Sequence, residues 1–530
     1  MIEDKAELPS GWVSATIGEL VPSGGIFNDG DWVESKDQDP DGDVRLIQLA
    51  DIGDSTFHDK SSRFLTTEKA KALNCTFLEK GDILIARMPD PLGRCCIFPF
   101  SGDGKFVTVV DVCVVRLSST SVSSKYLSYL INSQTVRSDI GALQSGSTRK
   151  RISRGNLATI RMPIAPRPEQ DRIVARVEEL FSELDEGIES LKSAREQLKV
   201  YRQAVLNHAF EGKITAEWRQ RNKKKLKSAD QLIAGIKVER DARYQQQLVE
   251  WKAAVKKWEV TKQKGKKPSR PRILKPLRKL ADDIRTVLPD IPDIWVWEKL
   301  GWMTCGVEYG TGAKSSESGS VPVIRMGNLQ NGMIDWQDLA FTSDRAEIEK
   351  YSLIPGDVLF NRTNSPELVG KTAIYRGERP ALFAGYLIRV NHIATIVNSQ
   401  YLNLFLGCHI ARQYGNTVKT DGVNQSNING EKLQGYPFPY CSLAEQCEVV
   451  RILDEKLSLT DRLMQEIDAQ LMKSHALRQS ILRKAFTGRL VAQYPKDEPA
   501  FVLLERIKAE KAEQNRDSKN NNNNKLRDAA

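Results

Sequence analysis

The stretch that decides the fold spans residues 164–181 and reads IAPRPEQDRIVARVEELF. A matching stretch, YCSLAEQCEVVRILDEKL, occupies residues 440–457, at a constant offset of 276. The match continues without a gap from residue 152 to residue 212, and both copies end in a Leu-x2-Ala-Phe-x-Gly pattern. Self-similarity of this length predicts a duplication, and its period is far longer than that of solenoid repeats. The chain therefore carries two copies of a whole module followed by a helix.

Each copy predicts one long helix with a coiled-coil seam. After Pro168 there is no proline up to Phe210 and the only glycine is Gly187, so a helix of about 43 residues would extend about 64 Å. Apolar residues recur in a seven-residue pattern in both copies. They are Val177, Leu184, Leu191 and Leu198 in the first copy, and Leu453, Leu457, Met464, Ile467, Leu471 and Ile481 in the second. An ordinary amphipathic helix is the alternative, but a sevenfold seam in both copies favours a coiled coil between the two helices.

Both modules read as mixed α/β structure. Short β-rich runs between Gly, Pro, Asn and Asp turns accompany one helical stretch in each module, residues 125–140 and 400–414. We predict an α+β fold, with two repeated mixed α/β domains separated by two long antiparallel coiled-coil helices with approximate two-fold symmetry. The predicted segments are a first recognition domain at 1–165, a first long helix at 166–212, a basic helix-rich linker at 213–288, a second recognition domain at 289–440, a second long helix at 441–490, and a charged C-terminal helix with a disordered Asn-rich tail at 491–530.

Length and composition exclude several classes of protein. The 530 residues need more than one domain, and no run approaches the ~20 apolar residues that span a bilayer. The N-terminus has no secretory apolar region. The eight cysteines contain no CxxC pair and read as reduced thiols, and the five histidines are scattered. We therefore expect a cytoplasmic protein with no metal site and no membrane partner.

Positive charge is concentrated in one segment. Residues 213–285 contain 23 Lys and Arg against 8 Asp and Glu, whereas the whole chain has a net charge of +10, so the remainder is net negative. One interpretation is a solvated, self-repelling linker. The other is a phosphate-binding arm without sequence preference, whose affinity would fall steeply with salt. Composition alone does not separate the two.

The duplication has a geometric consequence. Two like modules in one chain usually pack about an approximate two-fold axis, and if that axis crosses the two helices they run antiparallel, with a module at each far end. Duplex DNA also has a two-fold axis perpendicular to its length, which dimeric readers use to contact two spaced half-sites. Because the modules have diverged, the two half-sites should differ, and the target would be split and asymmetric.

No convincing catalytic set is found in the sequence. The segment Glu367-Leu-Val-Gly370-Lys371-Thr372 mimics the end of a phosphate loop, but Ser365 stands where that pattern needs glycine. Gly310-Thr-Gly312 lacks the third glycine of a dinucleotide fingerprint. We therefore predict a chain that is not an enzyme.

Four features recur in the same order in both copies. Each module opens with Leu8-Pro-Ser-Gly-Trp12 or Ile291-Pro-Asp-Ile-Trp295, and each contains a Gly-Asp-Ile/Val-Leu strand. An Ile-x4-Leu-x5-Pro approach then leads to the Glu-Gln helix start and to the shared helix end. In this order, and twice, these features resemble the specificity subunit of a type I restriction–modification system over nearly the whole chain.

The resemblance implies a division of labour. Two target-recognition domains would each read one half of a bipartite double-stranded DNA site, with the helices as a ruler. Catalysis would belong to partners: two modification subunits that methylate adenine with S-adenosylmethionine, and two restriction subunits that use ATP and Mg²⁺ to translocate and cut. The chain would hold no cofactor of its own. It departs from compact members in the basic insertion after Gly212.

Candidate DNA contacts lie in matching places of the two modules. They are Arg87, Arg149, Lys150 and Arg151 in the first module, and Arg362, Lys419, Asn424 and Gln425 in the second. The run 149–151 favours backbone phosphate contact. Asn and Gln pair with adenine in the major groove, or simply form turns. Arg87 and Arg362 either reach DNA or are exposed charges at a strand end.

Two further alternatives stay open. Arg202 and Arg478 continue the seam, either with their stems along it and their charges in water, or as a register device. For the whole chain, the alternative to a DNA-reading subunit is a coiled-coil protein-interaction scaffold with two binding modules and no direct DNA readout.

Overall fold

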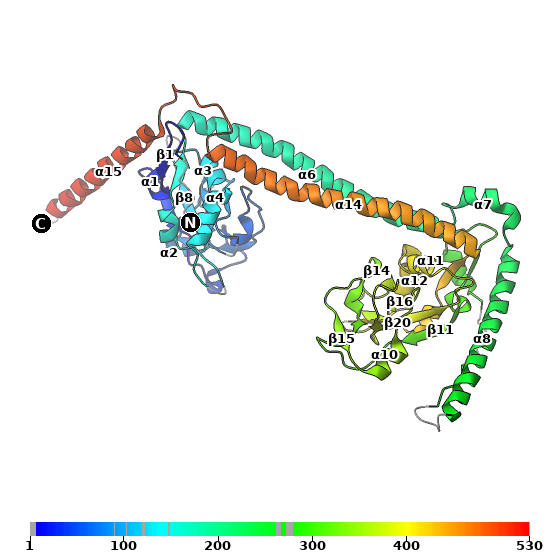
Figure 1. Cartoon of the computed structure of the whole chain (residues 1–530). Helices are drawn as coiled ribbons and strands as arrows, with labels where there is room; N and C mark the ends of the chain where they lie inside the picture. Colours follow the sequence, from blue (N-terminus) through cyan, green and yellow to red (C-terminus); the bar gives the residue numbers. More distant parts are fainter. Residues whose placement is uncertain are drawn as a thin grey trace. The chain divides into compact units, whose positions relative to one another are not determined.

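The computed structural model describes residues 7–88, 91–101, 103–118, 122–146, 149–260, 267–271, 279–423 and 425–528 (Figure 1). The chain divides into two compact units. Unit 1 comprises Met1–Lys192 and Ile467–Ala530, and unit 2 comprises Ser193–Glu466. Each unit contains one module and part of each long helix.

The module of unit 1 is built on three small sheets. Its elements are β1 (Val13–Ala15), α1 (Ile17–Leu20), β2 (Ile26–Asp29), η1 (Ser35–Asp37), β3 (Val44–Ile47), η2 (Leu49–Asp51), β4 (Arg63–Leu65), α2 (Thr67–Ala72), β5 (Ile83–Ala86), β6 (Cys95–Ile97), β7 (Phe106–Thr108), β8 (Val112–Arg116), α3 (Ser124–Ile131), α4 (Gln134–Ala142), α5 (Arg154–Thr159) and β9 (Met162–Ile164). The strand orders are β2-β8-β5-β6, β4-β3-β7 and β1-β9. The central strands β5 and β8 bury both faces, because alternate residues such as Ile83 and Leu84 enter two different apolar cores.

The module of unit 2 repeats this plan with additions. Its elements are β10 (Val296–Lys299), η4 (Leu300–Met303), β11 (Thr304–Tyr309), β12 (Val321–Ile324), η5 (Met326–Asn328), β13 (Leu329–Gln330), β14 (Gly332–Ile334), β15 (Ala340–Thr342), α10 (Arg345–Tyr351), β16 (Val358–Asn361), β17 (Thr363–Asn364), β18 (Thr372–Ile374), β19 (Leu382–Phe383), β20 (Leu387–His392), α11 (Ser399–Leu406), α12 (His409–Val418), β21 (Thr420–Asp421), β22 (Ser426–Asn427), α13 (Gly430–Gln434) and β23 (Pro437–Tyr440). The strand orders are β11-β20-β16-β18-β14-β13, β15-β12-β19, β17-β22-β21 and β10-β23.

One pairing closes each module. The opening strand pairs antiparallel with the strand that leads into the long helix, as Val13 with Ile164 in unit 1 and Val296 with Tyr440 in unit 2. The tryptophan before each opening strand, Trp12 or Trp295, is buried. Each module therefore begins and ends at the base of a long helix.

The helical stretch of each module is two helices, where the sequence led us to expect one. The break falls between α3 and α4 at Asn132–Ser133, and between α11 and α12 at Gly407–Cys408. The Asn132 side chain bonds to the backbone of Cys95 and of Ser128. Asn and Gly both weaken a helix, and Asn does so because its amide competes for backbone groups.

The two long helices pack on each other in both units. They are α6 (Arg167–Phe210) and α14 (Leu443–Phe486), of 44 residues each. In unit 1 the first half of α6 and the last half of α14 share one core through Val177 and Ile481. In unit 2 the last half of α6 and the first half of α14 do the same through Val205 and Leu453. This pattern requires antiparallel helices, and the predicted fold class is confirmed.

The seam residues are withdrawn from water along both helices. Of the predicted set, Val177, Leu453, Leu457 and Ile481 are buried, and Leu184, Leu191, Leu198, Met464, Ile467 and Leu471 are half-buried. The buried seam residues also belong to the cores of the modules. The half-buried seam residues do not, so the partner helix alone shields them from water.

Four more helices flank the modules. They are α7 (Ala216–Asn222), α8 (Ala229–Val260) and α9 (Asp282–Val287) in unit 2, with the short η3 (Lys223–Lys225), and α15 (Ala500–Asp528) in unit 1. α15 continues through the asparagine-rich stretch, which we expected to be a disordered tail. Extending an existing helix is far less costly than nucleating one.

The repeat extends into α8 and α15. Ile236 of α8 is buried in the core of unit 2, and Ile507 of α15 is buried in the core of unit 1. One turn further, Arg240 donates to the carbonyl of Gly301 at 2.5 Å, and Lys511 donates to the carbonyl of Gly18 at 2.8 Å. Each module thus receives a docked helix with a cation over the same backbone position. Across the part of the chain that is described, no helix has the length and apolar character to traverse a bilayer.

Candidate nucleic-acid interface

A β-hairpin precedes α13 in unit 2. β22 pairs with both β21 and β17, and Gly422 N–H donates to the carbonyl of Gln425 at 2.8 Å across the tip. Val423 at the tip is 100% exposed, and Gln425 is exposed. Lys419 enters the hairpin with its Nζ 3.8 Å from Asp421. Asn424 lies outside the described residues. The tip therefore offers an apolar side chain and an amide to solvent.

The same position in unit 1 carries a different hairpin. Ser145 and Arg151 exchange two backbone hydrogen bonds of 2.8 and 2.9 Å, so the chain reverses between them. Arg149, Lys150 and Arg151 are exposed. This hairpin exposes positive charge where the described tip residues of unit 2, Val423 and Gln425, are neutral.

Arg87 is not at the surface, and both of our sequence hypotheses for it assumed that it was. Its side chain is 8% exposed, its Nε lies 3.3 Å from Asp29 Oδ1, and its guanidinium also donates to the carbonyl of Val110. Backbone N–H of Ile152 donates to the Arg87 carbonyl at 3.1 Å. A buried cation needs a paired acid and hydrogen-bond acceptors, so Arg87 joins elements inside the module.

Arg362 occupies the same place in unit 2 with a different neighbour. It follows β16 as Arg87 follows β5, and the strand registers place Tyr309 where Asp29 stands in unit 1. The Arg362 guanidinium lies 4.9 Å from the centre of the Tyr309 ring. Cation–π contact leaves the positive charge uncompensated by an acid. Arg362 is half-buried beside the 420–427 hairpin, to which Ile428 N–H links it through the Arg362 carbonyl.

Arg154 is a candidate that our reading of the sequence missed. It begins α5, directly after the basic hairpin of unit 1, with 45% of its side chain exposed. Its guanidinium lies 3.5 Å from Asp29 Oδ2 and donates to the Phe27 carbonyl at 2.7 Å. The signal was present, because Arg154 continues the run 149–151 after two residues.

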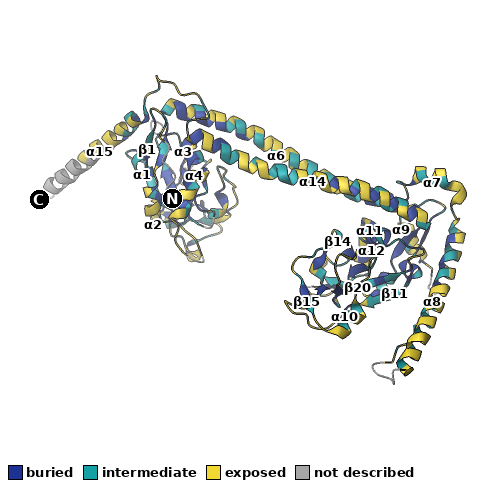
Figure 2. Cartoon of the chain, viewed as in Figure 1, coloured by how far each residue is buried: buried dark blue, intermediate teal, exposed yellow. Residues whose placement is uncertain are grey.

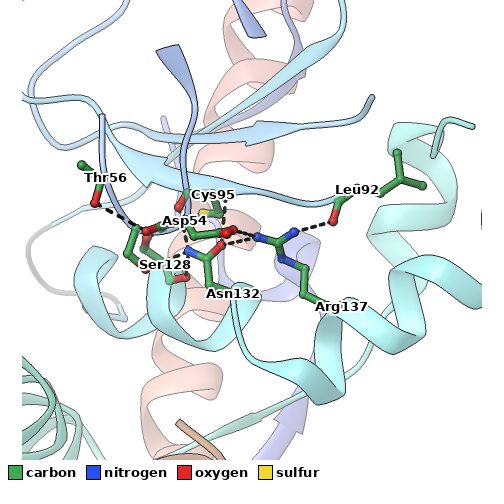
Figure 3. Close-up of polar contacts among 8 residues, drawn as sticks. Asp54, Thr56, Leu92, Cys95, Ser128, Asn132 and Arg137 are labelled. Atoms are coloured by element: carbon green, nitrogen blue, oxygen red, sulfur yellow. Dashed lines mark hydrogen bonds and ion pairs between the residues drawn. The ribbon is translucent and has the colours of Figure 1, made fainter. Parts of the chain in front are cut away.

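A polar network links Leu92 and Asp54 to the helix pair α3–α4 in unit 1 (Figure 3). Arg137 of α4 donates to the Leu92 carbonyl at 2.8 Å, to Asn132 Oδ1 at 2.7 Å and to Asp54. Asn132 in turn donates to the Cys95 carbonyl at 2.7 Å. Burial lowers the pKa of Arg137. The network therefore ties Asp54, Leu92 and Cys95 to the helix pair α3–α4.

Unit 2 replaces this network with a cavity. Arg412 of α12 lines a cavity of about 260 Å³ beneath the 365–370 turn, together with Glu367 and Lys371. Within that turn, N–H of Leu368 donates to the Ser365 carbonyl at 3.0 Å, and the strand β18 follows. The segment is a turn before a strand and lacks the helix that a phosphate loop requires.

Buried carboxylates start both long helices. Glu169 accepts from Trp12 Nε1 at 3.0 Å, whereas the equivalent Glu445 accepts from Thr215 Oγ1 at 2.9 Å and Arg219 Nε at 3.1 Å. The glutamines that follow these two residues make equivalent hydrogen bonds in the two units. Gln170 accepts from Ser123 N–H and Gln446 accepts from Asn398 N–H, both at 2.9 Å. The Glu-Gln pair is therefore a structural joint between the module and its long helix.

Among the residues that the structure describes, no three His, Cys, Asp or Glu side chains are grouped so as to hold a metal ion. The cysteines in that part of the chain are free thiols. Burial raises the pKa of Cys95 and of Cys408 to about 12. Such thiols are inert packing groups.

Comparison with known proteins agrees with this architecture. The model of the type I restriction modification DNA specificity domain matches residues 9–192 and 310–473. The EcoKI specificity subunit of Escherichia coli K12 is 25% identical over 416 residues, covering 76% of this chain and 74% of that protein. The MjaX protein of Methanocaldococcus jannaschii, a putative type I specificity subunit, is 29% identical over 209 residues, covering 38% of this chain and 48% of that protein.

Solved structures share the fold. A chain from a study of assembly and conformational transition of the type I restriction–modification system superposes with a TM-score of 0.63 at 17% identity, covering 92% of this chain and 100% of that chain. The HsdS subunit of Thermoanaerobacter tengcongensis gives 0.50 at 18% identity with the same coverage. Because the family model spans well over half of the sequence and falls on both repeats, the chain belongs to the type I restriction–modification DNA specificity family, whose members are non-catalytic subunits, as the sequence predicts.

Proposed function

We propose that the chain reads a split, asymmetric double-stranded DNA target, with one half-site for each module and the paired helices as the spacer. The observation that carries the proposal is the pair of unlike hairpins at matching positions. The unit 1 tip has Arg149, Lys150 and Arg151, and the unit 2 tip has Val423 and Gln425. Family membership favours this reading over a scaffold without DNA readout.

The chemistry of each tip suits a different part of the duplex. Arginine and lysine contact phosphates and guanine edges, whereas a glutamine amide pairs with adenine and an exposed valine fits the methyl group of thymine. A two-stranded β-ribbon is narrow enough to enter the major groove. Two unlike ribbons on one chain would therefore select two unlike half-sites.

Catalysis in this proposal belongs to partners in the cytoplasm. Two modification subunits supply adenine methylation with S-adenosylmethionine, and two restriction subunits supply ATP- and Mg²⁺-dependent translocation and cleavage. The chain itself binds none of these cofactors and selects the site for its partners.

The test is a module exchange in the assembled complex. Residues 17–151 of unit 1 are replaced by those of a relative, which leaves strands β1 and β9, the Trp12–Glu169 bond and both long helices intact. The chain is co-expressed with the modification subunits, and methylated adenines are mapped across the host genome. We expect one half of the methylated sequence to change and the other half and the gap to persist.

Two results would count against the proposal. Both halves changing together would contradict independent modules. Complete absence of methylation that depends on the wild-type chain would favour the scaffold. Insertion of seven residues in both helices, between Leu191 and Leu198 and between Ile467 and Leu471, serves as the matched control, because it should lengthen the gap alone.

A further inference from the structure

The basic segment after Gly212 is organised around an arm that projects from its module. α8 docks on unit 2 only through its first turns, where Leu232, Ile236 and Arg240 are buried and Glu239 accepts from Thr395 Oγ1 at 2.9 Å. From residue 241 to residue 260 no side chain of α8 is buried (Figure 2). These 20 residues extend the helix by about 30 Å. The strands of the module do not cover them.

A return segment stabilises the arm. Tyr244, Leu248, Trp251, Val255 and Trp258 form a half-buried stripe on α8. Trp251 Nε1 donates to the Pro268 carbonyl at 3.0 Å. Lys267 Nζ lies 5.5 Å from the centre of the Trp258 ring, and the Arg270 guanidinium lies 5.9 Å from the Trp251 ring. Residues 267–270 therefore pack against the apolar stripe of α8, with Lys267 and Arg270 beside the rings of Trp258 and Trp251.

The outer surface of the arm is positively charged. On residues 241–260 and 267–271 the exposed bases are Arg243, Lys252, Lys256, Lys257, Lys267 and Arg270, against three carboxylates, Asp241, Glu250 and Glu259. Glu250 lies 3.9 Å from Arg243. Spaced cations on a rigid rod match the regular phosphates of a duplex.

The repeat provides an internal comparison. α15 docks on unit 1 as α8 docks on unit 2, yet residues 500–513 carry three acids and three bases, and Lys508 is paired with Glu505 at 3.0 Å. Docking therefore does not require a positive helix. The charge excess lies in residues 213–285, which include the arm of unit 2, while the chain outside them is net negative.

We propose that this arm binds the sugar–phosphate backbone of duplex DNA beside the half-site read by unit 2, without sequence preference. The inference rests on the proposed DNA-reading function and adds a second, purely electrostatic contact to it. Its contribution to affinity falls with salt, because each phosphate contact releases counterions.

The test compares two matched variants of the full chain in complex with its modification subunits. The neutral variant carries K252Q, K256Q, K267Q and R270Q; the charge-conserving variant carries K252R, K256R, K267R and R270K. Affinity is measured from low to moderate salt for the target duplex and for a duplex of unrelated sequence. We expect the neutral variant to weaken both by the same factor, and to make the slope of log affinity against log salt less steep by about 2–4.

The outcomes separate the inference from the function on which it rests. The charge-conserving variant should keep the wild-type slope, and shortening the duplex beyond the unit 2 half-site should weaken the wild type but not the neutral variant. An unchanged salt slope in the neutral variant would overturn the proposed contact between the arm and DNA. So would a neutral variant that keeps its DNA affinity but no longer binds the modification subunits. Absence of any target preference in the wild type would instead count against the proposed function.

Discussion

Arg202 of α6 forms an ion pair with Asp461 of α14, with Nη1 2.5 Å from Oδ1. The same contact occurs with the roles of the helices exchanged, because Arg478 of α14 pairs with Asp185 of α6. Both residues of the second pair follow from the first by the repeat offset of 276. Arg478 also lies 4.4 Å from the centre of the Phe181 ring. The seam arginines therefore reach across to a carboxylate, which favours the register interpretation over charges that end only in water.

Reversing one member of such a pair should weaken the helix packing. Asp461→Arg places two cations together, and we expect a loss of about 0.5–1 kcal/mol in the free energy of unfolding, because the pair is partly exposed. The double variant Arg202→Asp with Asp461→Arg should restore most of it. Thermal unfolding at low and high salt measures both, and the effect should shrink in high salt. Additive single effects, with no restoration, would show that the pair does not couple the helices.

Glu169 and Glu445 are equivalent in the repeat but should respond differently to amidation. Glu445→Gln keeps an amide oxygen but removes the buried negative charge that pairs with the Arg219 guanidinium, and we expect a loss of about 1.5–3 kcal/mol. Glu169→Gln keeps an acceptor for Trp12 Nε1. Burial raises the pKa of Glu169, so amidation also removes a carboxylate whose charge is disfavoured there. The loss at residue 169 should stay under about 1 kcal/mol. Urea unfolding of the two variants side by side provides the comparison, and equal losses would contradict it.

Asp31 should make unit 1 less stable as the pH rises through the weakly acidic range. Burial raises the pKa of Asp31 to about 6, although Thr76 N–H donates to both of its oxygens, at 3.1 and 3.0 Å. The folded state then holds the proton more tightly than the unfolded state, so the contribution of Asp31 to stability declines between about pH 4 and pH 6. In Asp31→Asn the melting temperature should depend less on pH between about pH 4 and pH 6 than it does in the wild type. Asp41→Asn, at an exposed side chain, is the control; parallel curves for wild type and Asp31→Asn would refute the assignment.

Arg87 and Arg362 should separate stability from DNA binding. Arg87→Ala removes a buried guanidinium that pairs with Asp29 and bonds to the Val110 carbonyl, so we expect a loss of stability of about 1–3 kcal/mol. Arg362→Ala removes a cation–π contact worth about 1 kcal/mol and a cation beside the hairpin. It should leave folding nearly intact and weaken DNA binding by the assembled complex. Thermal unfolding and a duplex-binding titration on both variants test this, and the reverse pattern would show that our assignment of the two sites is wrong.

Alanine substitutions at the two hairpin tips should have different effects on DNA binding. Gln425→Ala should reduce discrimination at one base position of a half-site by about 1–3 kcal/mol and leave the salt dependence unchanged. Lys150→Ala should weaken all duplexes alike and make the salt slope less steep by about 0.9. Competition binding with duplexes substituted one position at a time measures both effects. Loss of discrimination in Lys150→Ala, with its salt slope unchanged, would reverse the roles.

The candidate site was predictable in its location but not in every residue. Adjacent basic residues at 149–151 and turn formers at 419–425 predict surface loops, because such residues are seldom buried. The same reasoning fails for Arg87. A charged residue after a strand is usually exposed, and only the approach of Asp29 from another strand makes burial tolerable.

The apolar periodicity and the repeat were enough to predict the overall architecture from the sequence. A sevenfold seam repeated at one offset specifies two long helices that bury a shared stripe, because the period of an apolar pattern sets which face a helix buries. The docking of α15 on the module of unit 1 also has a sequence signal, because Leu503 and Ile507 of α15 match Leu232 and Ile236 of α8 in spacing and residue type.

What the sequence by itself determined was therefore local and periodic: the duplication, the antiparallel long helices and the place of the two candidate contact loops. Tertiary structure alone decided which equivalent residues share a role. Gln170 and Gln446 make the same bonds, whereas Glu169 and Glu445 do not, and Arg87 meets an acid where Arg362 meets a ring. The physical reason is that a polar side chain takes its energy from the partners that distant segments bring to it, and those partners have no fixed spacing along the chain.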